Sequence, residues 1–71
     1  MLRAERLKKG LSQRKLSRIS GVSQSYISKI EDPKFYHSPT LKQIIALSKA
    51  LNIYPKLLAN DLIDKELNSN I

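Results

Sequence analysis

The segment Ser12–Glu31, SQRKLSRISGVSQSYISKIE, constrains the fold more than any other part of the chain. Its first residue can cap a short helix that carries Leu16 and Ile19 on its apolar side. Gly21 follows where this helix must end in a sharp turn, which a residue with positive φ allows. Two short helices joined by such a turn bury too little apolar surface alone, so the flanking segments are expected to complete a core behind them.

The second helix of this unit, from Gln24 to about Glu31, has two distinct sides. With each residue placed ~100° after the last, Ile27 and Ile30 fall on the inner side. Asp32-Pro33 ends the helix, because the residue before a proline is pushed out of the helical region. The outer side is a polar stripe of one amide, two hydroxyls and one ammonium group, formed by Gln24, Ser25, Ser28 and Lys29.

Helices are also predicted on both sides of this unit. The first runs from Leu2 to Lys9 and ends at Gly10, after which Leu11 can fold back onto Leu7. Another is capped by Thr40 and runs to about residue 51, with apolar residues at helical spacing. These residues are Leu41, Ile44, Ile45, Leu47 and Leu51.

A fifth helix is predicted to begin at Pro55, a residue that suits the first helical position. Its apolar side would be formed by Leu57, Leu58, Leu62 and Ile63, of which Leu57 and Leu58 are the expected core residues. The polar segment Lys65–Ile71 is expected to fray. The fold class is therefore all-α, a compact domain of five helices with a helix-turn-helix at the second and third. Residues 1–60 are interpreted as this domain, and residues 61–71 as a C-terminal tail.

Positive charge is concentrated in the first half of the chain. The 71 residues contain 13 Lys and Arg against 6 Asp and Glu, a net charge of +7. Residues 1–35 hold nine bases and three acids, whereas residues 36–71 hold four and three. A positive field concentrated in this way suits a polyanionic partner, either nucleic acid or an acidic membrane. The simplest alternative is a small protein whose surface is basic without binding such a partner. With no cysteine and no apolar run of the ~18 residues that a membrane span needs, a cytoplasmic protein is expected.

The chain resembles the Cro and phage-repressor type helix-turn-helix proteins, the XRE family. The resemblance covers Leu2 to about Leu58 and rests on four motifs, G-L-S-Q at 10–13, L-S-x-x-S-G-V-S-Q at 16–24, Y-I-S-K-I-E at 26–31 and P-T-L at 39–41. It implies a lambda-repressor-like domain of five helices. The chain departs from the family pattern at Lys15, where an acidic residue is frequent, and at Pro33, where a glycine is frequent. The loop up to Pro39 is also longer than usual.

The polar stripe supplies the candidate base-reading residues, Gln24, Ser25, Ser28 and Lys29. Gln24 can pair with adenine and Lys29 can donate to guanine acceptors in the major groove. The resemblance implies that the starts of the second and fourth helices face the two phosphate strands. The candidate phosphate contacts are Gln13, Arg14, Lys15, Tyr26, Lys34, Thr40 and Lys42. Ordinary solvated surface is the alternative for each of these residues.

Arg6 and Glu31 are expected to form a structural ion pair. In proteins of the resembled family, an arginine four residues before the glycine bonds the glutamate that ends the recognition helix. A charge-assisted fork of this kind would clamp the third helix against the first. The alternative is two unrelated surface charges.

The predicted function is that of a sequence-specific regulator of transcription that binds double-stranded DNA, and repression is favoured because no activating or ligand-sensing domain fits in 71 residues. The alternative is a helix-turn-helix antitoxin or a protein-binding adaptor with the same fold. No cofactor, metal, membrane or small-molecule ligand is implied. An enzyme is the weaker hypothesis, because His37 stands alone in a loop without a nearby acid or cysteine.

A homodimer on a pseudopalindromic operator is expected, because one recognition helix reads only a few base pairs. The apolar residues of the fifth helix exceed what one side of a terminal helix can bury, which makes its end the candidate dimer interface. The residues proposed for it are Leu62, Ile63 and Leu67. The alternative is a C-terminal helix that folds back over its own core.

Overall fold

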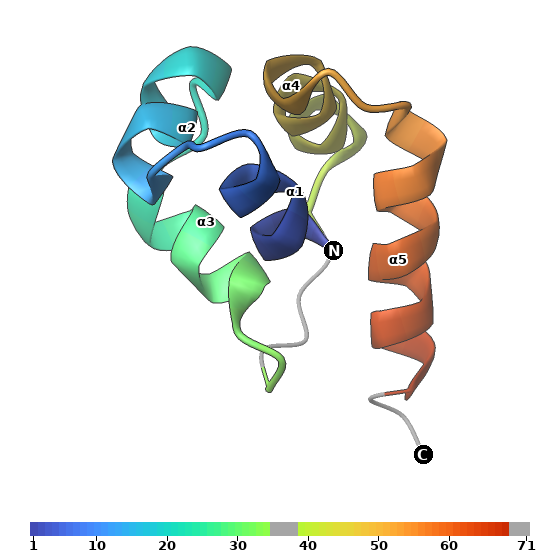
Figure 1. Cartoon of the computed structure of the whole chain (residues 1–71). Helices are drawn as coiled ribbons and strands as arrows, with labels where there is room; N and C mark the ends of the chain where they lie inside the picture. Colours follow the sequence, from blue (N-terminus) through green and yellow to red (C-terminus); the bar gives the residue numbers. More distant parts are fainter. Residues whose placement is uncertain (35–38, 69–71) are drawn as a thin grey trace.

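The computed structural model describes residues 1–34 and 39–68 of the chain. These residues form five helices and no strand, which confirms the predicted all-α class. The helices are α1 (Leu2–Lys8), α2 (Gln13–Ser20), α3 (Gln24–Glu31), α4 (Leu41–Leu51) and α5 (Pro55–Asn68). Figure 1 shows α2 and α3 on one side of the molecule and α5 on the other, with α1 between them.

The helix boundaries follow from the capping residues that the sequence places at them. The Ser12 hydroxyl accepts from the Lys15 amide at 3.0 Å, and the Ser23 hydroxyl accepts from the Tyr26 amide at 3.2 Å. Thr40 begins α4 with a reciprocal capping box in which Gln43 is the partner. Gly21 ends α2 with a φ of 77°, the left-handed conformation predicted for the turn. These local signals explain why short helices begin and end where they do.

One apolar core joins all five helices. α2 packs against both α3 and α4, and α5 packs against α4. The buried side chains come from every helix and from the turn after α2, and they are Leu2, Leu16, Val22, Ile27, Ile30, Ile44, Leu47, Leu51, Leu58 and Leu62. The two inner residues of α3 are thus fixed from behind, which leaves its outer side available for binding.

Some residues predicted on apolar sides are exposed in the structure. Leu7 and Ile19 are about half exposed, and Leu41 and Ile45 also face solvent. Leu57 is 54% exposed, whereas its neighbour Leu58 is fully buried. Adjacent residues point ~100° apart on a helix, so only one of the two can face α4. In a domain this small, each helix buries only a narrow stripe, and residues at the edge of the stripe remain in contact with water.

The C-terminal helix differs most from the sequence prediction. The sequence predicts that Lys65–Ile71 frays, but α5 continues through Lys65 to Asn68. Leu62 lies one helical turn after Leu58 and is buried in the core. It is therefore not available for the dimer interface to which the sequence assigned it. Ile63 and Leu67 are 54% and 61% exposed and remain on the outer side of the helix.

Candidate nucleic-acid interface

The turn between α2 and α3 sets the orientation of the outer stripe. The Val22 side chain is buried directly after Gly21, and its amide donates to the Ser20 hydroxyl at 3.1 Å. Ile27 and Ile30 then bury the inner side of α3. With both ends of the turn fixed in this way, the four stripe residues, Gln24, Ser25, Ser28 and Lys29, are all exposed. Figure 1 shows α3, the helix that carries the stripe, packed beside α2.

The candidate phosphate residues differ in their exposure. Arg14 and Lys15 are exposed in the first turn of α2. Thr40 and Lys42 are exposed at the start of α4, where free backbone amides also favour an anion. Lys34 is exposed after α3, whereas Tyr26 is half-buried and burial raises the pKa of its phenol. The residues between 34 and 39, including His37, lie outside the described residues.

The side chain of Gln13, another phosphate candidate, is engaged within the protein. Its amide Nε2 donates to Glu31 Oε1 at 3.0 Å. Since a side-chain amide carries two hydrogens, one remains to donate elsewhere. Gln13 therefore belongs to the support of α3 as well as to the exposed start of α2.

Arg6 and Glu31 form a two-pronged ion pair beneath the interface. Arg6 Nε donates to Glu31 Oε2 at 2.7 Å, and Arg6 Nη2 donates to Oε1 at 2.9 Å. The two side chains are only 9% and 5% exposed. Arg6 Nη1 also donates to the Leu11 carbonyl at 2.8 Å. This network joins α1, the start of α2 and the end of α3.

Protonation of this network follows from its surroundings. Burial alone would raise the pKa of the Glu31 carboxyl, but the hydrogen bonds from Arg6 and Gln13 and the charges of Arg6 and Arg3 outweigh it. The pKa of Glu31 is therefore lowered. The hydrogen bond to Glu31 raises the pKa of Arg6 despite its burial. Both groups are charged near neutral pH, which is the state in which the fork is strongest.

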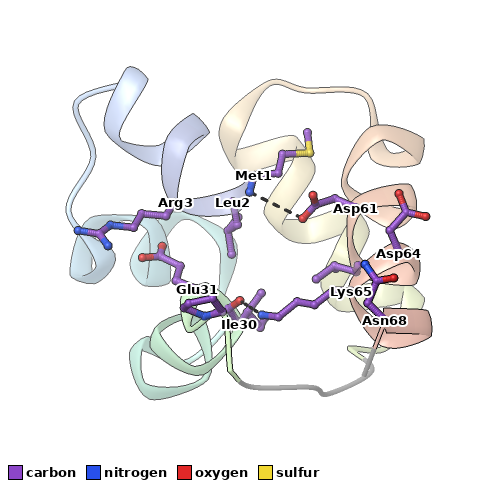
Figure 2. A pocket seen from close by; sticks show the side chains of 11 residues that line it. Met1, Leu2, Arg3, Ile30, Glu31, Asp61, Asp64, Lys65 and Asn68 are labelled. Atoms are coloured by element: carbon purple, nitrogen blue, oxygen red, sulfur yellow. Dashed lines mark hydrogen bonds and ion pairs between the residues drawn. The ribbon is translucent and has the colours of Figure 1, made fainter. Parts of the chain in front are cut away.

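A groove of about 390 Å³ lies between α1, the end of α3 and α5. Its lining carries charges of both signs (Figure 2), and these come from Arg3, Glu31, Asp61, Asp64 and Lys65. The amino group of Met1 is 3.7 Å from Asp61 Oδ2. Lys65 extends from α5 to the end of α3, a contact that helical periodicity does not predict because it joins residues far apart in the chain.

Residues 1–34 and 39–68 contain neither a candidate metal site nor a candidate membrane span. No group of three or more His, Cys, Asp or Glu side chains in these ranges could hold a metal ion. Within the same ranges, no helix has the length and apolar character needed to cross a membrane.

A buried scaffold that presents an exposed polar helix beside basic helix starts is the architecture of a helix-turn-helix DNA-binding domain. A family model described as helix-turn-helix matches residues 2–58. The chain therefore belongs to the Cro and phage-repressor type helix-turn-helix family, the XRE family, and is a DNA-binding regulator of transcription. A search of curated proteins and a search of solved structures gave no significant match.

Proposed function

We propose that the protein is a repressor that reads operator DNA in the major groove with α3. The observation that carries this proposal is the exposed stripe on a helix whose inner side is fixed by Ile27 and Ile30. A helix fits the major groove, and its outward side chains can reach base edges. Because the protein has to meet genomic DNA, the proposed location is the cytoplasm.

The proposed contacts divide into base reading and phosphate binding. Gln24 would pair with an adenine and Lys29 with a guanine, while Ser25 and Ser28 would contact either a base or a phosphate. The phosphate contacts would come from both flanks of the stripe and fix the protein's position on the duplex. They are Gln13, Arg14, Lys15, Tyr26, Lys34, Thr40 and Lys42.

Substitutions at Gln24 and Lys42 test this division. Gln24→Ala should change which base is preferred and cost ~1–3 kcal/mol on the best site. Lys42→Ala should weaken all sequences alike and reduce the slope of log K against log salt by about one. Lys56→Ala is a matched control, because Lys56 is an exposed lysine on α5, which lies on the other side of the molecule from α3 (Figure 1). Binding would be measured by fluorescence anisotropy on DNA from beside the protein's own gene, with each base pair varied.

Two results would contradict this part of the proposal. Identical specificity profiles for Gln24→Ala and Lys42→Ala would show that the two roles are wrongly assigned. Binding that does not weaken with salt would contradict a DNA-binding surface, because neutralised phosphates must release counterions. Repression would be tested separately with a reporter behind the same DNA, where activation by the protein would refute it.

We propose that the active form is a homodimer on a pseudopalindromic operator. The exposed pair Ile63 and Leu67 is one helical turn apart on α5 and supports an apolar contact between two copies. Leu62 is left out because it is buried in the core. Half-sites would lie about one DNA turn apart, roughly 34–36 Å.

Point substitutions test this interface better than a truncation. Removal of residues 61–71 would also remove the buried Leu62 and the contact of Lys65 with α3. Ile63→Asp should instead lower the sedimentation mass and the cooperativity on a two-half-site operator, while a single half-site is still bound. Asn60→Asp adds the same charge at an exposed position of α5 without removing an apolar group. An unchanged mass and unchanged cooperativity in Ile63→Asp would exclude this surface.

A protein-binding adaptor or antitoxin is the second candidate function. The observation that favours it is the exposure of large apolar side chains outside the stripe, with Leu41 at 74% and Tyr54 at 63%. Exposed apolar surface of this kind suits a protein partner. Absent or salt-independent DNA binding would favour this candidate over the repressor.

A further inference from the structure

The C-terminal end of α3 lacks the usual way of completing a helix. The carbonyl of Ile30 would ordinarily accept from the backbone N–H four residues later, which is that of Lys34. The Lys34 amide donates instead to Asp32 Oδ1 at 2.9 Å. Pro33 has no N–H to offer. The Lys29 carbonyl accepts from the Asp32 amide at 3.2 Å, so it is the Ile30 carbonyl that Asp32-Pro33 leaves without its usual backbone donor.

The donor that replaces it comes from α5, more than thirty residues later in the chain. Lys65 Nζ donates to the Ile30 carbonyl at 2.9 Å and to the Asp32 carbonyl at 2.7 Å. Figure 2 shows the Lys65 side chain extending across the groove to the end of α3. A cation at this position also meets the negative end of the helix dipole, which favours it further.

The backbone of Lys65 is fixed by the packing of α5. Leu58 and Leu62 are buried on the same side of that helix, in the two turns before Lys65. Lys65 is itself half-buried. The core therefore places the Lys65 backbone within reach of α3, and the two hydrogen bonds hold its ammonium group there. Lys65 also lies beyond residues 2–58, the part of the chain that the family model matches.

We propose that Lys65 is a positioning residue for DNA reading, which caps the C-terminal end of α3 and holds its last turn in place. This inference rests on the proposed function, because it concerns the helix that would read the operator. Ser28 and Lys29 lie in the half of α3 next to the capped carbonyls. Gln24 lies at the other end, where the Ser23 hydroxyl caps the helix independently. Loss of the Lys65 contact should thus affect base reading by Lys29 and spare base reading by Gln24.

The test compares three variants of the full chain. Lys65→Met removes the ammonium group but keeps a long side chain, and Lys65→Arg keeps the charge and the donors. Lys56→Met is the matched control, because it removes the same charge from an exposed position of α5. Amide hydrogen exchange would follow the end of α3, and binding to operator variants would follow base preference. Lys29→Ala and Gln24→Ala identify the base pairs that each residue reads.

Lys65→Met should speed exchange of the Ile30, Glu31 and Asp32 amides on the order of tenfold. It should also reduce base preference several-fold at the base pairs that depend on Lys29, with the preference that depends on Gln24 retained. Lys65→Arg should restore both properties, and Lys56→Met should change neither. A general loss of stability would instead weaken binding to all sequences alike.

Three outcomes would overturn some part of this inference, and they can be told apart. Unchanged exchange in Lys65→Met would refute the cap. Faster exchange with an unaltered base preference would refute the positioning role and leave a contact that only stabilises the fold. Failure of the unsubstituted chain to bind duplex DNA would refute the proposed function, and the exchange measurement would then still decide the cap.

Discussion

Removal of the Glu31 carboxylate should strongly destabilise the fold, because its side chain and that of Arg6 are only 5% and 9% exposed. In Glu31→Ala, the Arg6 guanidinium would remain buried and keep only the Leu11 carbonyl of its present partners. An unpaired buried charge of this kind costs about 3–5 kcal/mol. At roughly 0.05–0.15 kcal/mol per residue, a domain of this length has a free energy of unfolding of about 4–11 kcal/mol. The variant should therefore lose roughly a quarter or more of its free energy of unfolding.

The double variant separates the loss of the pair from the loss of one partner. Arg6→Met together with Glu31→Leu removes both charges and keeps apolar volume, so it should be closer to the unsubstituted protein than Glu31→Ala is. Gln13→Ala removes one hydrogen bond to a charged group and should cost ~1.5–3 kcal/mol, less than Glu31→Ala. The loss of free energy of unfolding is therefore predicted to be largest in Glu31→Ala, whatever the absolute values of the three losses.

Urea unfolding followed by circular dichroism at pH 7 would measure each variant. If Arg6 and Glu31 are coupled, the double variant loses much less free energy of unfolding than Arg6→Met and Glu31→Leu lose in sum when each is made alone. It would be refuted if Glu31→Ala cost less than about 1 kcal/mol, because that would place the pair among exposed ion pairs. Additive losses in the double variant would refute the coupling between Arg6 and Glu31.

The same unfolding assay tests three further substitutions, Glu31→Gln, Ser48→Ala and Gly21→Ala. Because the pKa of Glu31 is lowered in the folded state, the carboxylate contributes its full stabilisation above its ordinary pKa of 4.5 and loses it as the pH falls through the lowered value. When unfolding is measured from pH 7 down to pH 3, the free energy of unfolding should therefore fall less in Glu31→Gln than in the unsubstituted protein. Ser48→Ala should stabilise the fold by ~1 kcal/mol, because the buried Ser48 hydroxyl finds no hydrogen-bond partner among the described residues; a loss of stability would contradict this. Gly21→Ala should cost ~1–2 kcal/mol from its φ of 77° alone, since an added Cβ meets no atom within 4 Å; a much larger loss would point to a steric clash instead.

The local structure of the binding unit could be predicted from the sequence because its signals are local. Ser12, Ser23 and Thr40 cap helices through amides only three residues away. Gly21 and Asn52 take left-handed conformations that their residue types allow. The inner position of Ile27 and Ile30 follows from helical spacing within one short helix. Their outward counterparts, the stripe residues, follow from the same spacing.

Only the tertiary structure decided which apolar residues of α5 face the core. Leu57 and Leu58 are equivalent in the sequence, and the direction from which α4 approaches buries Leu58 and exposes Leu57. The same packing buries Leu62, which the sequence assigned to a dimer interface, and leaves Ile63 outside. Periodicity defines which residues share a side of a helix, but it does not say which side the neighbouring helix covers.

Contacts between residues far apart in the chain were likewise decided by the tertiary structure and not by local sequence signals. Arg6 and Glu31 could be paired in advance only through resemblance to a family, and the place of Gln13 beside them was not foreseen. The Lys65 contact with α3 had no sequence signal apart from Pro33, whose missing N–H shows that the end of the helix needs another donor. The sequence by itself thus determined the helices, their ends and the polar side of α3. The tertiary structure decided how those ends are held, because a hydrogen bond across the fold depends on where the core places two backbones that are far apart in the chain.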